Sequence, residues 1–230
     1  MNINVFKPFF DLLTLPYPGP YMTLLMLSFI LGFPIIQLLS RRFDLSTRRT
    51  LPLWAIVAFS ALVGSKIFHV LFDERLSYYL GMIGEKGIVV FLTTALNPFT
   101  GGHVFYGGIA GAFSVGLLVV WRIYREESPT RLRYYDLFVI PTALGLVLSR
   151  IGCFFSGCCF GIVSDTFGVV FPPFSTAAMD LYRKGQLDFL IDETPPLIPT
   201  QLIESAASLA IFIYLLSQVR KAKHRSPGLS

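Results

Sequence analysis

The sequence predicts an all-α polytopic membrane protein with about five transmembrane helices. Of the 230 residues, 53% are hydrophobic and 14% are charged, whereas a soluble domain carries roughly 25% charged residues. Five apolar runs are each close to the roughly 20 residues needed to cross the hydrocarbon core. The net charge of +5 comes from basic residues beside these runs, a pattern that indicates membrane orientation and no nucleic-acid partner.

The chain is predicted to form one membrane domain over residues 1–230. Residues 1–20, which are broken by Pro16, Pro18 and Pro20, are interpreted as a lead-in that lies on the surface of the lipid bilayer. The predicted transmembrane spans are residues 21–40, 51–72, 104–121, 136–155 and 199–218.

Two longer connections are predicted to be irregular. Residues 73–103 contain one apolar piece, residues 87–96, which is too short to cross the membrane and is expected to re-enter it or lie at its surface. Residues 162–198 carry five acidic and two basic residues. Within them, residues 167–172 are expected to form a short strand or extended piece that ends at the Pro172–Pro173 pair.

The basic residues gather in the loops 41–50 and 122–133 and in the tail 220–225. Because cytoplasmic segments of membrane proteins are enriched in Lys and Arg, these three segments are predicted to face the cytoplasm. The N-terminus and both irregular regions are then expected outside, and the C-terminus is expected in the cytoplasm.

Residues 149–161, SRIGCFFSGCCFG, contain all three cysteines of the chain and one arginine. An arginine at the rim of a membrane span is costly unless it is paired, so Arg150 is a candidate for function. The alternative is that its long side chain only reaches up to the lipid head groups. The predicted topology places Arg150 at the outer leaflet and within reach of Glu204, which favours binding of a lipid phosphate.

The three cysteines admit several interpretations. Together with His103 they could bind zinc, but the spacing C-x4-C-C is atypical of zinc sites, and no metal is expected. A disulfide between Cys153 and Cys158 suits an oxidising face of the membrane, and small apolar packing residues are at least as good an explanation. A catalytic thiol would need a base partner, which the sequence does not reveal.

The run GGHVFYGGIAGA, residues 101–112, opens the third span. Gly107 and Gly111 are spaced for close packing between helices, while the Gly101–Gly102 pair could offer backbone N–H groups to a phosphate. Packing leaves Tyr106 unexplained. A tyrosine among glycines at the outer face is either an interface anchor or a hydroxyl aimed into a cavity.

The run PTQLIE, residues 199–204, opens the last span, and its first two residues suit the start of a helix. Glu204 shares a helix face with Gln201, about one turn into lipid. An unpaired carboxylate at this depth is costly, so Glu204 needs a donor such as Arg150 or Lys66, or it must be protonated.

These three runs, in order and spacing, resemble the motifs of the prolipoprotein diacylglyceryl transferases over roughly residues 20–218. The resemblance implies a multi-pass enzyme of the bacterial cytoplasmic (inner) membrane, with its active face toward the periplasm or outside. Such an enzyme of lipoprotein biogenesis moves the diacylglyceryl group of phosphatidylglycerol onto the lipobox cysteine of a preprolipoprotein and releases glycerol phosphate. The resemblance implies no cofactor, and the nucleophilic thiol belongs to the substrate.

The resemblance also implies a set of site residues. Arg150 would hold the lipid phosphate through a bidentate guanidinium contact, and Tyr106 and Glu204 would be the other catalytic residues of the cleft. The residues expected to bind substrate are Tyr21, Lys66, His103, Gly107, Gly108, Cys153, Ser156, Gly157, Cys158, Gly161 and Gln201.

The sequence departs from the family pattern at several positions. Cys153, Cys158 and Tyr106 stand where better-known members carry Asn, Glu and His. The chain also stops soon after the span 199–218, where the family usually continues with an outside segment and further crossings. Two alternatives therefore stay open: a lipid-binding membrane protein of the same fold without transferase activity, and a thiol-based membrane redox protein that uses Cys153 with Cys158 or Cys159.

Overall fold

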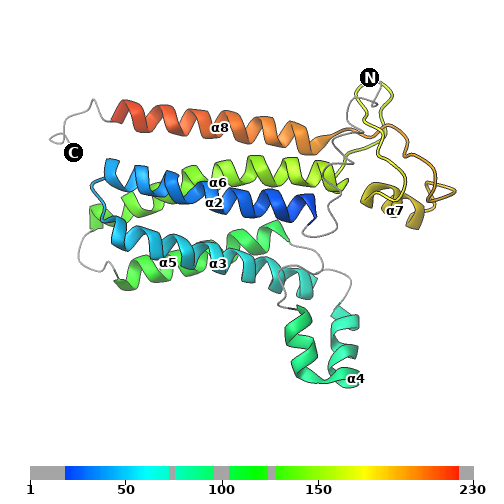
Figure 1. Ribbon diagram of the computed structural model, residues 1–230, viewed down its shortest axis with the longest axis horizontal. Coiled ribbons are helices and arrows are strands. Elements are labelled where there is room, and N and C mark those ends of the chain that lie inside the picture. Colours follow the sequence, from blue (N-terminus) through cyan, green and yellow to red (C-terminus); the bar gives the residue numbers. More distant parts are fainter. Residues whose placement is uncertain (1–18, 73–75, 96–103, 124–127, 223–230) are drawn as a thin grey trace. The chain divides into compact units, whose positions relative to one another are not determined.

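The computed structural model describes residues 19–72, 76–95, 104–123 and 128–222, and helices are the regular elements found within these ranges. The helices, labelled in Figure 1, are α2 (Pro20–Arg42), α3 (Thr47–Phe72), α4 (Leu76–Ala95), α5 (Phe105–Ile123), α6 (Ser128–Ser156), α7 (Thr176–Arg183) and α8 (Thr200–Ala222). Five of them, α2, α3, α5, α6 and α8, are long and apolar enough to cross a membrane. The predicted class, an all-α polytopic membrane protein with about five transmembrane helices, is therefore confirmed.

Two of the spanning helices begin earlier than predicted, in polar sequence. α3 begins at Thr47 rather than at Leu51, because two N–H groups of its first turn donate to the carbonyl oxygen of Ser46. α6 begins at Ser128, whereas its apolar crossing part, Asp136–Ser156, matches the predicted span. Apolar length therefore marks the membrane-crossing part of each helix rather than its two ends.

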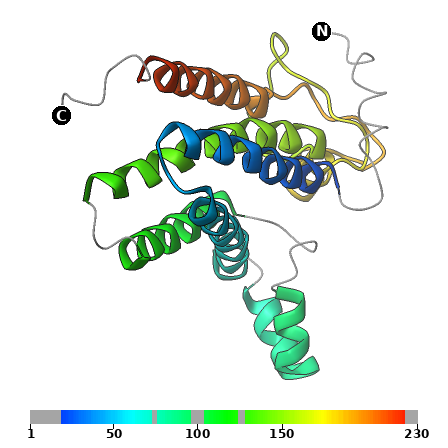
Figure 2. The ribbon, with the colours of Figure 1, turned by 60° about the vertical axis from the view of Figure 1, so that its left-hand side comes forward.

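The region between the second and third spans contains a broken helix. α4 is interrupted at Gly87, whose φ of 82° and ψ of 165° are not helical, and Figure 2 shows its two halves side by side. Glycine adopts such a conformation without the steric cost of a Cβ atom. The described part of the apolar piece, residues 87–95, thus corresponds to the second half of α4, and the first half was not predicted.

The chain divides into two compact units, here called the central unit (residues 33–138) and the flanking unit (residues 1–32 and 139–230). In the central unit, α3 packs directly against α5 (Figure 1). A Cβ atom at Gly107 would lie 2.5 Å from the carbonyl oxygen of Gly64 and 2.5 Å from Cβ of Phe68. Small residues therefore set the close approach of these two helices.

In the flanking unit, the last turns of α6 contact the first turns of both α2 and α8. A Cβ atom at Gly152 would lie 2.9 Å from Cα of Tyr21, so α2 approaches the α6 backbone closely. The hydroxyl of Ser205 on α8 donates to the carbonyl oxygen of Val147 on α6 at 3.2 Å. These contacts position the end of α6, where the cysteines and Arg150 lie.

Residues 162–198, here called the outside region, are mostly irregular, as predicted, but they enclose one short helix. α7 begins after Ser175, whose hydroxyl accepts a hydrogen bond from the N–H of Ala178 at 3.2 Å. In the segment expected to be extended, Val169 forms an isolated bridge with Leu197, and the carbonyl oxygen of Phe171 accepts a hydrogen bond from the N–H of Thr194 at 3.1 Å. No strand is present in this fully described part of the chain.

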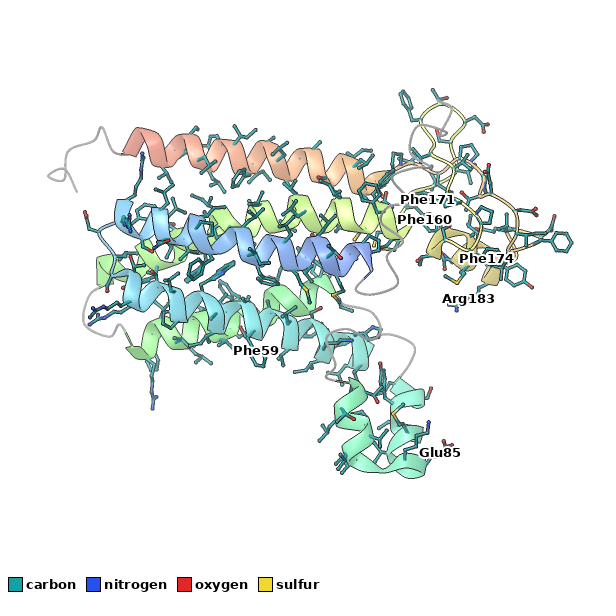
Figure 3. The ribbon with its side chains drawn as sticks, viewed as in Figure 1. Phe59, Glu85, Phe160, Phe171, Phe174 and Arg183 are labelled. Carbon is teal, nitrogen blue, oxygen red and sulfur yellow. The ribbon has the colours of Figure 1, made fainter. Side chains whose placement is uncertain are left out.

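The outside region also has a small apolar core that includes the end of α6. Its buried members are Phe154, Phe171, Ala177, Leu181 and Leu197. The rings of Phe160 and Phe171 lie 6.4 Å apart, and both are labelled where the outside region meets α6 in Figure 3. The outside region is thus packed onto α6 by hydrophobic burial, which is non-directional and needs no sequence motif.

Candidate functional site

The helix α6 ends in a turn that folds the chain back over its own last residues. The N–H of Gly157 donates to the carbonyl oxygen of Phe154 at 3.0 Å, and the N–H of Cys158 donates to that of Cys153 at 3.1 Å. This pair of bonds is the Schellman motif, which requires a left-handed residue after the helix. Gly157 supplies it with a φ of 67°. The turn therefore holds Cys158 directly beside Cys153.

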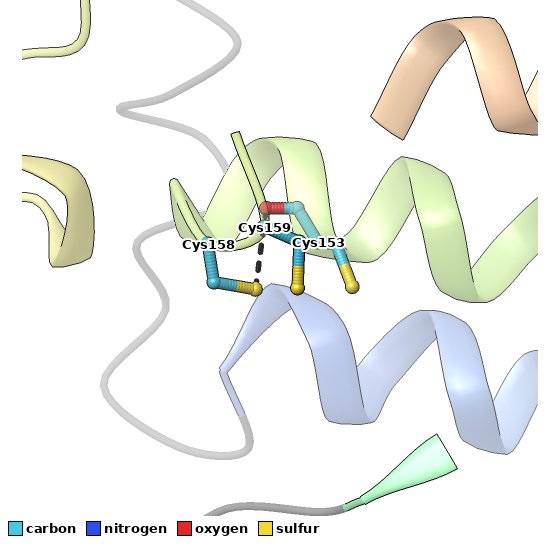
Figure 4. Close-up of side chains that lie close together, drawn as sticks. All are labelled: Cys153, Cys158 and Cys159. Carbon is cyan, nitrogen blue, oxygen red and sulfur yellow. Dashed lines mark hydrogen bonds between the residues drawn. The ribbon is translucent and has the colours of Figure 1, made fainter. Parts of the chain in front are cut away.

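The same turn brings the three cysteines together, and we call Cys153, Cys158 and Cys159 the cysteine cluster. Their Sγ atoms all lie within 4.8 Å of one another (Figure 4). All three thiols are free, with Cys153 buried, Cys158 partly buried and Cys159 exposed. The Sγ of Cys158 donates weakly to the carbonyl oxygen of Cys153 at 3.7 Å. The disulfide considered from the sequence is not formed here.

Cys159, which follows the end of the α6 span, has an unusual backbone and an unusual electrostatic environment. Its φ is 61°, in the left-handed region that few non-glycine residues adopt. Hydrogen bonds from the Cys153 and Cys158 thiols outweigh the effect of burial and, together with the positive charge of Arg150, lower the pKa of the Cys159 thiol. These contacts therefore favour the thiolate form at Cys159, the exposed member of the cluster.

Arg150 on α6 and Glu204 on α8 form an ion pair. The Nε of Arg150 lies 2.6 Å from Oε2 of Glu204, and their side chains are 23% and 51% exposed. The predicted need of Glu204 for a cationic partner is confirmed, and that partner is Arg150. A pair this exposed stabilises the fold by only about 0–1 kcal/mol, so its main effect is to orient the guanidinium group.

The first two residues of α8 are hydrogen-bonded to the cysteine turn. Thr200 Oγ1 donates to the carbonyl oxygen of Cys159 at 2.6 Å, and Gln201 Nε2 donates to that of Cys158 at 2.6 Å. Gln201 is 0% exposed, and its Oε1 has no hydrogen-bond partner among the described residues. A buried acceptor without a donor costs about 1–3 kcal/mol, which makes this oxygen a candidate contact for a bound molecule.

Four more of the expected substrate-binding residues belong to the flanking unit: Tyr21, Ser156, Gly157 and Gly161. Tyr21 contacts the end of α6 and interacts electrostatically with the cysteine cluster and Arg150. A Cβ atom at Gly161 would lie 2.9 Å from Cγ2 of Thr200. Gly157 and Gly161 are thus explained by backbone geometry, and their contact with a substrate stays a prediction.

The remaining expected residues belong to the central unit or lie outside the described residues. Tyr106 is 75% exposed in the first turn of α5, whereas Lys66 is 2% exposed within α3. Gly107 and Gly108 face α3, which agrees with the packing interpretation of their motif. His103 lies outside the described residues. The roles of all five toward a substrate stay predictions.

Two residues at this site, Cys159 and Thr200, were not among the predicted site residues. The adjacency of Cys158 and Cys159 in the sequence was the available signal for the first. Thr200 had been interpreted only as part of a helix start. Its hydrogen bond reaches 41 residues back along the chain, and no local pattern encodes such a contact.

Five apolar helices, with an arginine–glutamate pair joining the ends of two of them, define a polytopic membrane protein with a charged site near the boundary of its spans. The chain belongs to the prolipoprotein diacylglyceryl transferase family, whose sequence model matches residues 19–229.

Curated relatives are named phosphatidylglycerol–prolipoprotein diacylglyceryl transferase. The one from Tolumonas auensis is 27% identical over 210 residues, which cover 90% of this chain and 69% of the relative. The Prochlorococcus marinus protein is 25% identical, with 90% and 66% covered, and the Clostridium tetani protein is 30% identical, with 56% and 45% covered. The chain thus spans between 45% and 69% of the length of these relatives.

Proposed function

We propose that the protein transfers the diacylglyceryl group of phosphatidylglycerol to the cysteine thiol of a prolipoprotein, at the outer face of a bacterial cytoplasmic membrane. The observation that carries the proposal is the Arg150–Glu204 pair, which joins α6 to α8. Family membership and the names of the relatives support it. The peptide substrate would be the lipobox segment of a preprolipoprotein.

Arg150 is suited to hold the phosphate of the lipid. A guanidinium group keeps its charge at any physiological pH and presents five N–H donors in one plane. Glu204 contacts Nε, so the carboxylate fixes the plane in which the two terminal nitrogens lie. A phosphate in that plane would accept two parallel hydrogen bonds, the strongest geometry available for this pair of groups.

The proposed reaction is a displacement at the glycerol carbon that carries the phosphate. The substrate thiol loses its proton to water, its sulfur forms a bond to this carbon, and the carbon–oxygen bond to the phosphate breaks. The electron pair of that bond leaves with glycerol phosphate, whose growing negative charge Arg150 stabilises. None of the cysteines of this chain forms a covalent bond in the step.

Two further groups are proposed to contact the substrates. The buried Oε1 of Gln201 lacks a donor, and a hydroxyl of the glycerol head group would supply one. Tyr106 is exposed at the start of α5, where its hydroxyl would donate a hydrogen bond. Both contacts are neutral, so they would orient the substrate, while Arg150 supplies the charge that the leaving phosphate requires.

The test is a transfer assay in phosphatidylglycerol nanodiscs with a fluorescent lipobox peptide. We expect release of glycerol phosphate and a gain of one diacylglyceryl group in the mass of the peptide, but no reaction when the peptide cysteine is replaced by serine. Arg150→Ala should lower the rate by at least about a hundredfold. Absence of release by the wild-type protein, under conditions in which a relative is active, would refute the proposal.

A lipid-binding protein of the same fold without transfer chemistry is the second candidate. Cys153 and Cys158 favour it, because thiols stand where the family motif described above has Asn and Glu. The same nanodisc assay separates the two functions. Retention of phosphatidylglycerol in native mass spectrometry, lost in Arg150→Ala and unaccompanied by release of glycerol phosphate, would identify this second function.

A further inference from the structure

The thiols of the cysteine cluster undergo no chemistry in the proposed transfer, in which the substrate supplies the thiol. It nevertheless contains every cysteine of the chain, and the three sulfur atoms converge from a helix end and the turn that follows it. Apolar packing does not account for this arrangement, because Cys159 is exposed and Cys158 is only partly buried. A ligand shared by the three sulfur atoms would account for it.

We propose that the cysteine cluster is a three-thiolate binding site for copper(I). Metal–sulfur distances in thiolate sites are about 2.3 Å, so sulfur atoms around a three-coordinate ion lie about 4 Å apart. The three Sγ atoms are already within 4.8 Å of one another. Small rotations of the side chains therefore suffice to bring the sulfur atoms onto one ion.

The set of donor atoms selects the ion. Thiolates favour copper(I) and zinc(II) over harder ions. Within the described ranges, no His, Asp or Glu atom joins the three sulfur atoms. Zinc(II) in structural sites takes four protein ligands, which is one more than the cysteine cluster provides. Copper(I), a soft ion that forms trigonal thiolate complexes, is satisfied by three.

The backbone around the cluster is held by contacts that do not involve the thiols. The Gly157 turn fixes Cys158 against Cys153 through a 3.1 Å hydrogen bond. Cys159 keeps its left-handed φ of 61°, and Thr200 bonds to its carbonyl oxygen at 2.6 Å. Left-handed non-glycine residues persist where the surroundings impose them, and they gather at ligand-binding positions. The cluster is therefore organised before any ion is bound.

Charge and access also suit the proposed ion. Copper(I) with three thiolates carries a net charge of minus two, and the positive charge of Arg150 acts on Cys159. An anionic metal site near a membrane boundary is costly unless a cation lies close to it. Cys159 is exposed, so an ion can reach the cluster without passing through the helices.

The test is copper(I) binding by the full chain in detergent, under anaerobic and reducing conditions, in competition with a chromophoric copper(I) chelator. We expect one equivalent bound to the wild-type protein, with only sulfur neighbours in copper-edge X-ray absorption. Replacing all three cysteines by serine should weaken copper(I) binding more than about a hundredfold. Removal of residues that only hydrogen-bond to metal ligands already lowers metal affinity about 10–100-fold, and this variant removes the ligands themselves.

The controls address folding and nonspecific binding. Ser217→Ala removes a hydroxyl that bonds to the Tyr214 carbonyl within α8, and it should bind copper like the wild type. Cys159→Ser changes an exposed position, so it should keep the circular dichroism of the wild type and bind copper more weakly. Equal affinity of the cysteine-free and wild-type proteins, or coordination without sulfur, would refute the proposal. The assay measures no transfer, so its outcome is independent of the proposed enzymatic activity.

Discussion

The pair of Arg150 and Glu204 shows how a charge is accommodated at the edge of a membrane span. The two side chains are 23% and 51% exposed. Because neither is fully buried, the desolvation penalty for their charges is smaller than it would be for a buried pair. The stabilisation they provide is correspondingly small, about 0–1 kcal/mol. We infer that the pair matters for the direction of the guanidinium group more than for the stability of the fold.

Replacement of Glu204 by Gln therefore tests orientation separately from charge at Arg150. Glu204→Gln should lower kcat of the proposed transfer at least about tenfold, since a neutral amide holds the guanidinium by weaker hydrogen bonds. The KM for phosphatidylglycerol should not rise, because Arg150 keeps its charge. Glu193→Gln, the same change at an exposed carboxylate of the outside region, is the control in the nanodisc assay. Equal kinetics of the two variants would contradict the orienting role.

Gly157 offers a test of the turn that assembles the cysteine cluster. Its φ of 67° is unfavourable for a residue with a Cβ atom by about 1–2 kcal/mol, so Gly157→Ala should lower the free energy of unfolding by that amount. Gly81→Ala is the matched control, because a Cβ atom at this helical position in α4 would meet nothing within 4 Å. Thermal unfolding in detergent, followed by circular dichroism, measures both. A Gly157→Ala protein as stable as Gly81→Ala would argue against a required glycine.

At the scale of the elements, the contact between α3 and α5 tests the packing interpretation of the glycine motif. A Cβ atom at Gly107 would lie 2.5 Å from Gly64 O, whereas one at Gly116 would lie 3.5 Å from Val57 Cγ2, an ordinary contact. Gly107→Ala should therefore destabilise the protein by about 1–3 kcal/mol through overpacking. Gly116→Ala on the same helix should change little. The measurement is denaturant unfolding in mixed micelles, and equal stability of both variants would exclude the close contact.

The five spanning helices were predicted from the sequence, whereas α7 and the first half of α4 were not, and the two groups form for different physical reasons. A spanning helix is a property of local composition, because apolar length alone decides whether a segment can cross lipid. α7 is eight residues long and begins at a single serine cap, and its burial comes from the distant Phe154 and Leu197. The first half of α4 is likewise short of a spanning length and ends at Gly87. Such elements depend on tertiary contacts that a linear pattern does not contain.

At the scale of the whole molecule, the distribution of basic residues predicts that the cysteine turn lies at the outer face of the membrane, away from the cytoplasm. In a Cys153→Ser/Cys158→Ser variant, the exposed Cys159 should react with a membrane-impermeant maleimide in intact cells. In a cysteine-free background, Ser46→Cys, exposed between α2 and α3, should react only after permeabilisation. The opposite labelling pattern would reverse the predicted orientation.

Only part of the candidate site could be predicted from the sequence. The pairing of Arg150 with Glu204 followed from the cost of leaving a charge unpaired near lipid, which is a rule about single residues. The convergence of the three sulfur atoms did not follow, because it is produced by the Gly157 turn and the C-x4-C-C spacing is atypical of metal sites. The roles of Tyr106 and Lys66 rest on resemblance, and they stay predictions.

Backbone hydrogen bonds at the base of the outside region hold the two ends of this region together. Gly161 N–H donates to Ile198 O at 2.8 Å, and Ile198 N–H donates to Ile162 O at 2.9 Å. The polypeptide therefore departs from α6 and rejoins α8 at a single neck. Because these bonds hold the two ends of the outside region together, we expect changes of sequence within the region to leave the distance between Arg150 and Glu204 unaltered.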